Sequence, residues 1–222
     1  MKMSLFTRRS VCIPALLLAL VSVAAVPTAP TIDNSTPQKL IETSSRALLA
    51  DLDANRASYR KDIKGLYKVI DTVFLPHVDV EYAAQQVLGK HWRTATPEQK
   101  KRFVDAFYKS LLTTYGDALV DFTGDQMKVL PFKGDPAKDQ ASVKTEIRRS
   151  NGATVAVAYS LHKPVAGKPG AGVWMVYDVV IEGLSYIKSF REDFEVKINQ
   201  GGIDALLKDL ETKGVARPAV KG

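Results

Sequence analysis

A serine and a lysine three residues apart, Ser185 and Lys188, are the first candidates for chemistry in this sequence. Their spacing matches the S-x-x-K motif, in which penicillin-binding enzymes use the serine as a nucleophile. The S-D-N and K-T-G motifs that accompany it in those enzymes are absent from the sequence. A four-residue pattern with two free positions is common by chance. We therefore expect Ser185 to cap a helix and to have no catalytic role.

The side chains of His77, Asp79 and Glu81 are all of types that bind metal ions. They alternate along a region that predicts a turn into a helix, where residues two apart do not share a face. We expect Asp79 to cap that helix. His91 and His162 stand alone, without a spacing typical of metal ligands, so no metal site is predicted.

Asp178 is an acid in an otherwise apolar strand. A carboxylate buried in a pocket can act as a general base, as in steroid isomerases that combine helices with a curved sheet. The predicted face of Asp178 is opposite to that of Tyr177 and Ile181, away from the apolar side. We expect a structural ion pair with a lysine or arginine, and no catalytic residue.

The strand that carries Asp178 has the clearest period of two in the chain, from Val173 to Glu182. Gly183 ends the strand, and apolar residues then recur at helical spacing. The apolar positions on one side are Met175, Tyr177, Val179 and Ile181 in the strand and Leu184, Ile187 and Phe190 in the helix. A sheet face and a helix face are therefore expected to meet here.

The segments before this strand predict an antiparallel meander. Strands are expected at 127–130, 141–149 and 154–163, with a hairpin turn at 150–152 and a Pro- and Gly-rich loop at 163–172. One face of the strand at 154–163 consists of Val155, Val157, Tyr159 and Leu161.

Helices are expected from Pro37, at 63–75, from Asp79 to Gly89, and at 97–122, 185–199 and 203–213. The longest, 97–122, has Phe107, Leu111 and Tyr115 on one side. The order predicts an α+β fold, with a helical N-terminal part followed by a curved antiparallel sheet. The apolar faces of sheet and helices fill a solid core or line a cavity, and the pattern alone fits both.

The N-terminal residues differ in composition from the rest of the 222-residue chain. Lys2, Arg8 and Arg9 precede an apolar run to Val26, which predicts a signal peptide at 1–25 and favours the general secretory route. Its removal takes three basic residues and no acidic one, so the formal charge falls from +7 to +4. Charges of both signs are mixed along the remainder, which disfavours nucleic-acid binding. The only cysteine, Cys12, is also lost, which excludes disulfides.

The expected organisation of the remaining chain is simple. A flexible lead at 26–36 precedes a single α+β domain with a helical subdomain at 37–214, and the residues 215–222 are expected to fray. With 45% hydrophobic residues, the domain has enough apolar material to fill a core or to enclose a cavity.

Two long stretches, 77–119 and 173–210, resemble the MlaC, or toluene-tolerance auxiliary, family. The resemblance covers nearly the whole mature chain, and its most specific motifs are LGKHWRTATPEQ, TYGDAL, VYDVVIEG and GGIDALL. Members of this family are soluble periplasmic phospholipid carriers. The resemblance therefore implies a nuclear-transport-factor-2-like sheet that encloses an apolar cavity with the helical part, with the acyl chains inside and the headgroup outward.

The resemblance also implies the partners of the chain. As a monomer in the periplasm, it would shuttle phospholipid between an inner-membrane ABC complex with a lipid-binding ring and an outer-membrane lipoprotein complex, maintaining outer-membrane lipid asymmetry. No cofactor other than the bound phospholipid and no catalytic residue is implied. The alternatives are a small-molecule enzyme on the same sheet, or a chaperone for hydrophobic ligands. The expected cavity lining is Phe107, Leu111, Tyr115, Val155, Val157, Tyr159, Leu161, Met175, Tyr177, Val179, Ile181, Leu184, Ile187 and Phe190.

The signal peptide generates a first prediction. Small residues at 22–25 predict cleavage after Ala24 or Ala25, so the mature chain should begin at Ala25 or Val26. Intact-mass measurement of protein from the periplasmic fraction checks this. A chain that still carries residues 1–24 would contradict the predicted export.

Overall fold

The computed structural model describes residues 30–122, 127–135, 137–148 and 152–216. The expected signal peptide, the first part of the lead, and Ser150 and Asn151 of the expected hairpin turn lie outside the described residues. Within the described ranges, no helix is both long and apolar enough to cross a membrane.

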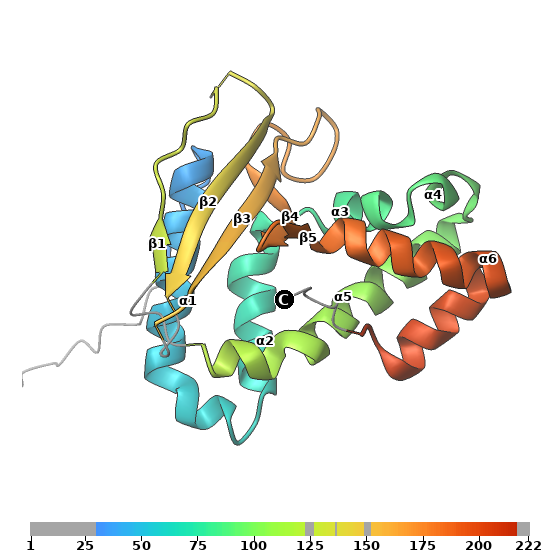
Figure 1. The fold of residues 1–222 in the computed structure, drawn as a ribbon, viewed down its shortest axis with the longest axis horizontal. Coiled ribbons are helices and arrows are strands. Elements are labelled where there is room, and N and C mark those ends of the chain that lie inside the picture. Colours follow the sequence, from blue (N-terminus) through green and yellow to red (C-terminus); the bar gives the residue numbers. More distant parts are fainter. Residues whose placement is uncertain (1–29, 123–126, 136, 149–151, 217–222) are drawn as a thin grey trace, which may run out of the picture.

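Five strands form one antiparallel sheet, in which each strand pairs with the next in sequence (Figure 1). Their bounds are β1 Met127–Val129, β2 Gln140–Arg148, β3 Thr154–His162, β4 Met175–Ile181 and β5 Leu184–Ser185. The α+β class is confirmed. The short β5 differs from the prediction, because Leu184 pairs with Ile181 as a strand residue and the following helix begins at Tyr186.

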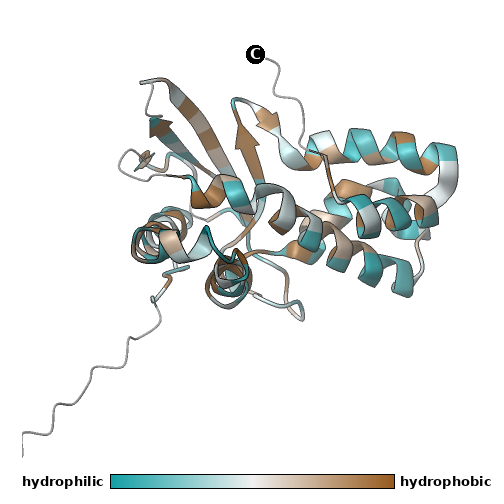
Figure 2. Cartoon of the chain, turned by 90° about the horizontal axis from the view of Figure 1, so that it is seen from below, coloured by the Kyte–Doolittle hydropathy of each residue, from teal (hydrophilic) through white to brown (hydrophobic). Residues whose placement is uncertain are grey.

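The sheet has one polar and one apolar face, which is clearest in β2. Lys144 and Glu146 are exposed, whereas Val143 and Thr145 on the other face are 0% and 1% exposed. One solvated face is typical of antiparallel sheets, and the apolar face needs a cover. In Figure 2 the strands lie along the top of the view and most helices lie below or beside them.

Helix α1, Pro37–Tyr59, covers one end of the apolar face. Thr36 caps this helix by accepting a hydrogen bond from the Lys39 N–H, and Pro37 takes the first helical position. The contact between α1 and the sheet forms a buried cluster, here called the sheet core. Its members are Leu40, Ile41, Val143, Leu161 and Trp174.

A β-bulge interrupts the alternation of β4. Asp178 pairs with Ser160, but the next pair joins Val176 to Leu161, so Tyr177 is left without a partner on β3. Because of this extra residue, Met175 and Val176, which precede the bulge, lie on the opposite faces from those that strict alternation along β4 would give.

This shift corrects the predicted face of β4. Met175 pairs with His162, and the Tyr177 ring lies 5.3 Å from the His162 ring, on the opposite face from the sheet core. Val179 and Ile181 keep the predicted face, because they follow the bulge. The common face predicted for all four residues is therefore wrong for Met175 and Tyr177.

The remaining helices follow the predicted order with local differences. They are α2 Lys64–Val69, the π-helical η1 Ile70–Phe74, the 3-10 turn η2 Leu75–His77, α3 Val80–Leu88, α4 Lys90–Thr94, α5 Pro97–Val120 and α6 Tyr186–Lys213. The helix expected at 63–75 is thus divided into three geometries, and α4 is an additional helix. The two helices expected at the end of the chain are the arms of α6, which bends at Gly202.

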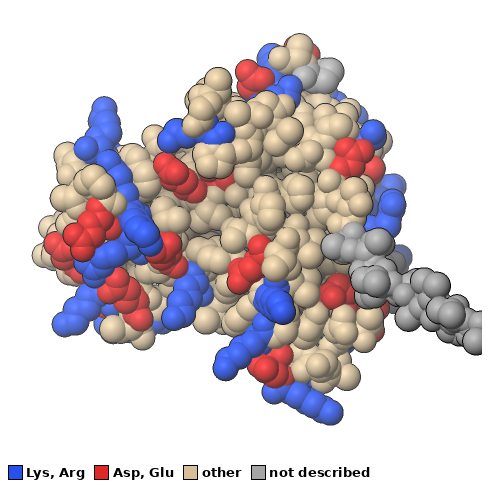
Figure 3. Space-filling model, turned by 180° about the vertical axis from the view of Figure 1, so that it is seen from behind, with Lys and Arg blue, Asp and Glu red and all other residues tan. Residues whose placement is uncertain are grey.

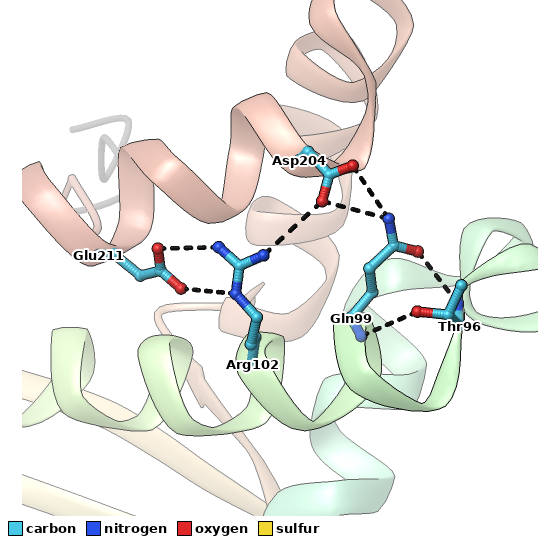
Figure 4. Close-up of polar contacts among 5 residues, drawn as sticks. All are labelled: Thr96, Gln99, Arg102, Asp204 and Glu211. Atoms are coloured by element: carbon cyan, nitrogen blue, oxygen red, sulfur yellow. Dashed lines mark hydrogen bonds and ion pairs between the residues drawn. The ribbon is translucent and has the colours of Figure 1, made fainter.

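Helix α5 begins with a capping box and is tied to the second arm of α6 (Figure 4). Thr96 and Gln99 exchange hydrogen bonds of 3.0 and 3.1 Å, and the Gln99 amide also donates to Asp204. The Arg102 guanidinium donates two parallel 3.0 Å hydrogen bonds to Glu211. A bidentate pair of this kind fixes the relative position of two helices more precisely than a single contact.

Described residues at both ends of the domain make tertiary contacts. Ile32 packs against the sheet core, and the Asn34 carbonyl accepts a hydrogen bond from the Trp174 N–H. Val215 is buried, and its carbonyl accepts a 3.0 Å hydrogen bond from the Thr114 hydroxyl. The tertiary contacts of the described residues therefore include Ile32 and Val215.

The bend in α6 generates a second prediction. Gly202 has φ 77° and ψ 174°, a conformation essentially reserved for glycine. Gly202→Ala should therefore lower the free energy of unfolding by about 1–3 kcal/mol. Urea denaturation measures the loss, with Gln200→Ala at an exposed helical position as the control. Equal stability of the two variants would contradict the assigned strain.

Candidate functional site

Most buried apolar residues of the described chain fall into three separate clusters, and Ala95, Val157 and Met175 belong to none of them. Domains usually contain one contiguous core, so the division itself is informative. The first is the sheet core. The second, the helical core between α3, α5 and α6, contains Ala83, Ala84, Val87, Leu88, Phe103, Ala106, Phe107, Ile187, Phe190, Phe194, Leu206, Leu207, Leu210 and Val215. The third, the α1–α2 core, contains Leu52, Tyr59, Leu66 and Val120.

Half of the residues expected to line a cavity lie in or against two of these cores. Phe107, Ile187 and Phe190 are members of the helical core, and Leu111 and Tyr177 pack against it. Leu161 is a member of the sheet core, and Tyr159 packs against it. The helical core is filled by aromatic rings, with centroids of Phe107 and Phe190 5.3 Å apart in edge-to-face contact.

A second group of the expected lining residues belongs to none of the three cores. These residues are Val155, Val157, Val179, Ile181 and Leu184, here called the open sheet face, together with Tyr115 on α5. The pairs Val157–Ile181 and Ile181–Leu184 place them side by side on β3, β4 and β5, on the same face as the sheet core. The apolar face therefore continues past the point where α1 closes it.

Helices α2 and α5 and the η1 segment also carry half-buried apolar side chains that belong to no core. They are Val69, Val73, Phe74 and Leu112. The η1 segment is attached to α5, since the Tyr108 hydroxyl hydrogen bonds to Asp71. Tyr67 of α2 lies so close to α5 that a Cβ on Gly116 would meet its ring at 2.7 Å. The open sheet face and these helical residues are therefore apolar groups that lie outside the three buried clusters.

The polar groups near the open sheet face are few and satisfied by local partners. Burial raises the pKa of Tyr159 further above its usual value, so the hydroxyl stays protonated well beyond pH 7. The buried Thr145 hydroxyl donates a 3.1 Å hydrogen bond to the Val157 carbonyl. The open sheet face itself consists of aliphatic residues, so its chemistry is that of an apolar surface.

Asp178 lies on the other face of the sheet and caps the start of α6. Its carboxylate is 9% exposed and accepts hydrogen bonds from the Ser185 hydroxyl (2.6 Å) and the Ile187 N–H (3.1 Å). The expected ion pair with a lysine or arginine is therefore corrected to hydrogen bonds with a helix N-terminus, where unpaired N–H groups favour a carboxylate.

Ser185 has the predicted capping role. Its hydroxyl oxygen accepts a 3.0 Å hydrogen bond from the Lys188 N–H, and its proton is donated to Asp178. The Lys188 backbone, and not its exposed side chain, makes this contact with Ser185. The S-x-x-K spacing is thus a feature of the helix cap.

The candidate metal ligands are also separated by the fold. Asp79 caps α3 by accepting from the Tyr82 N–H, and its second oxygen lies 3.0 Å from His162 Nε2. His162, expected to stand alone, therefore has a partner that sequence spacing did not indicate. Burial lowers the pKa of His77. No group of three or more potential ligands is found among the described residues.

Two cavities lie outside the open sheet face. One, of about 490 Å³ between α5 and the end of α6, is lined partly by charged residues such as Arg102, Asp105 and Lys109. The other, of about 400 Å³, lies where α3 begins beside the ends of β3 and β4. Met175 lines this second cavity. It is thus separated from the other residues that were expected to line the same cavity, none of which lines this one.

Comparisons with known proteins agree on one family. The family model for the MlaC protein matches residues 42–212. The toluene tolerance protein ttg2D of Pseudomonas putida is 32% identical over 186 residues, covering 83% of each chain. The intermembrane phospholipid transport system binding protein MlaC of Haemophilus influenzae is 25% identical over 195 residues, 88% of this chain and 90% of that protein.

A solved structure extends the similarity to the fold. It is that of a phospholipid-binding protein from Ralstonia solanacearum in complex with a phospholipid. The TM-score is 0.72 at 25% identity, over 80% of this chain and 96% of that one. Because the family model and the relatives span most of the chain, and the α+β fold is shared, this chain belongs to the MlaC family.

Proposed function

We propose that this chain is a periplasmic phospholipid carrier whose acyl chains lie against the open sheet face. The observation that carries the proposal is the apolar open sheet face, whose residues belong to none of the three buried clusters, although Val157 itself is 5% exposed. The similar Ralstonia solanacearum protein, whose structure contains a phospholipid, supports the same choice of ligand. The headgroup remains outside, because no charged residue belongs to the open sheet face.

The energetics of lipid transfer explain why such a carrier needs no catalytic group. Two acyl chains of about 15 methylenes each would cost roughly 25 kcal/mol to expose to water, at ~0.8 kcal/mol per CH₂. A lined apolar region removes most of this cost. Since a bilayer offers the same apolar environment, uptake and release are nearly balanced in free energy, and no bond is made or broken.

The proposal places the carrier between two membranes. It receives or delivers phospholipid at an inner-membrane ABC complex with a lipid-binding ring and at an outer-membrane lipoprotein complex, and thereby maintains outer-membrane lipid asymmetry. The Haemophilus influenzae relative, named for intermembrane phospholipid transport, supports this role.

Acidic and basic side chains are mixed around a broad uncharged area of the face in Figure 3, which fits a soluble monomer and not a nucleic-acid-binding protein.

The chaperone alternative requires a large exposed apolar patch. Among the described residues, the exposed large hydrophobics are Val165, Val173 and Val196. These belong to a loop and to α6 and do not form one broad patch, so the carrier is favoured over the chaperone.

The open sheet face generates a third prediction. Val157→Trp should leave the stability of delipidated protein nearly unchanged, because the indole occupies ligand space, while bound phospholipid falls sharply. Val143→Trp, on the neighbouring strand, is the matched control: Val143 and Val157 are 0% and 5% exposed, but only Val143 belongs to the sheet core. There the same ring should overpack and cost about 1–3 kcal/mol or more. Thermal unfolding of delipidated protein and phosphorus content of native protein measure the two effects.

Organic extraction and mass spectrometry of the native wild-type protein complete this test. The carrier proposal expects diacyl phospholipid in the extract. Wild-type protein without lipid, together with equal destabilisation by Val157→Trp and Val143→Trp, would mean that both sites are solid core and that the proposal is wrong. Recovery of a small polar metabolite in place of a phospholipid would favour the enzyme alternative.

The enzyme alternative generates a fourth prediction. Ser185→Ala removes a helix cap and the hydrogen bond to Asp178, so it should lower the free energy of unfolding by about 1–2 kcal/mol. Bound phospholipid and transfer between vesicles should not change. Ser142→Ala, at an exposed position of β2, is the control. Loss of lipid transfer in a folded Ser185→Ala protein would revive a chemical role for Ser185.

A further inference from the structure

The open sheet face ends where the chain leaves the sheet and enters α6. Leu184 belongs to this face and pairs with Ile181, and α6 begins two residues later at Tyr186. Tyr186 is half-buried and packs against the helical core. An apolar face that belongs to no core and a core that side chains fill therefore meet at the start of α6.

Tyr186 is the middle ring in a series of aromatic contacts. Its ring centroid lies 5.7 Å from that of Tyr115 on α5, with the two planes tilted by 59°. It also lies 6.1 Å from the ring of Phe190 in an edge-to-face arrangement, and Phe190 is a member of the helical core. The series thus runs from Tyr115, which is a member of none of the three cores, to the filled helical core.

The open sheet face is also limited along its strands. Val155 and Val157 of β3 belong to this face, whereas Leu161, further along the same strand, is a member of the sheet core. Tyr159 packs against that core. The face is therefore limited by the sheet core along β3 and by the ring of Tyr186 beyond β5. An apolar surface with such limits has room for an acyl chain of limited length.

Neighbouring contacts fix the part of α5 that carries Tyr115. The Thr114 hydroxyl donates a 3.0 Å hydrogen bond to the Val215 carbonyl, which ties α5 to the residues after α6. Gly116 is buried, and a Cβ at this position would lie 2.7 Å from the Tyr67 ring of α2. The backbone on both sides of Tyr115 is thus held against other elements, so its ring has a defined position.

From these contacts we propose that the Tyr115–Tyr186 pair sets the longest acyl chain that the open sheet face accommodates. The inference rests on the proposed function, because it takes a phospholipid acyl chain as the ligand of this face. The chain lies along the face with its terminal methyl group against the two rings. The last methylenes of a longer chain find the rings in their place and stay in water.

The rings should produce a limit in affinity and not a steady trend. Burial of each methylene contributes about 0.8 kcal/mol, which is about a fourfold gain in affinity. Affinity therefore rises with acyl length as long as each added methylene finds apolar surface. Beyond the limit the gain per methylene disappears. The acyl length at which the gain disappears is the property that the two tyrosines determine.

The test compares variants of the delipidated mature protein. Tyr115→Ala removes one ring of the pair, and Tyr186→Leu replaces the other ring but keeps an apolar side chain against the helical core. Tyr115→Phe keeps the ring and is the conservative control. Tyr82→Ala is the control for loss of a ring elsewhere, because Tyr82 stacks on His162 on the opposite face of the sheet.

The probes are saturated lysophosphatidylcholines that differ only in acyl length, and the dissociation constant is measured for each. Thermal unfolding establishes that every variant is folded at the temperature of the assay. In the wild type, Tyr115→Phe and Tyr82→Ala, affinity should rise and level off at the same acyl length. In Tyr115→Ala and Tyr186→Leu, the rise of about fourfold per methylene should continue to longer chains. Phospholipid extracted from these two variants should also carry longer chains.

Three results would overturn the inference. They are an unchanged limit in folded Tyr115→Ala, an equal loss of affinity at all acyl lengths in that variant, and a shift of the limit in Tyr82→Ala as large as that in Tyr115→Ala. If Tyr186→Leu unfolds, Tyr115→Ala decides alone, since Tyr115 is a member of no core. A wild type that binds no lysophosphatidylcholine and carries no phospholipid would refute the proposed function itself. A lipid-binding wild type with an unchanged limit in Tyr115→Ala would refute only this inference.

Discussion

The apolar face of the sheet must be covered, and α1 covers only one end of it. Val143 and Leu161 are closed off by Leu40 and Ile41 in the sheet core, while Val157, on the same face, belongs to no core. An antiparallel sheet with one apolar face is stable only when something shields that face from water. Here the shield is protein at one end and, in our proposal, acyl chains at the other.

Two carboxylates attach the helical core to the sheet. Asp178 anchors the N-terminus of α6 through Ser185 and Ile187, and the Asp79–His162 contact anchors the N-terminus of α3. Both carboxylates therefore connect helix ends to the polar face of the sheet. The filled helical core is therefore attached on the opposite face of the sheet from the open sheet face.

Local signals in the sequence predicted much of the fold because they depend on a few neighbouring residues. Thr36, Asp79, Thr96 and Ser185 all cap helices, since each supplies a side-chain oxygen to N–H groups that have no other partner. The meander was likewise readable from alternation and turn residues. The π-helical η1 and the short α4 were not, because they depend on packing between helices distant in sequence.

The candidate site was predicted only in part, for a physical reason. The bulge at Tyr177 reverses the alternation of β4, and no residue type in that strand marks where a bulge must occur. Phe107 and Val157 are equally apolar in sequence, yet the first fills the helical core and the second belongs to no core. An apolar stripe packs against other side chains or borders a cavity according to the distance between the two elements. Hydrophobic periodicity gives the face on which a residue lies and carries no information on that distance.

The location of bound lipid tests the central claim most directly. Delipidated protein reloaded with a phospholipid brominated on its acyl chains can be crystallised, and anomalous scattering then locates the bromine atoms. The account predicts bromine peaks in contact with Val157 and Ile181, between the three cores. Peaks confined to the cavity beside Met175, or bromine only on the outer surface of the protein, would contradict it.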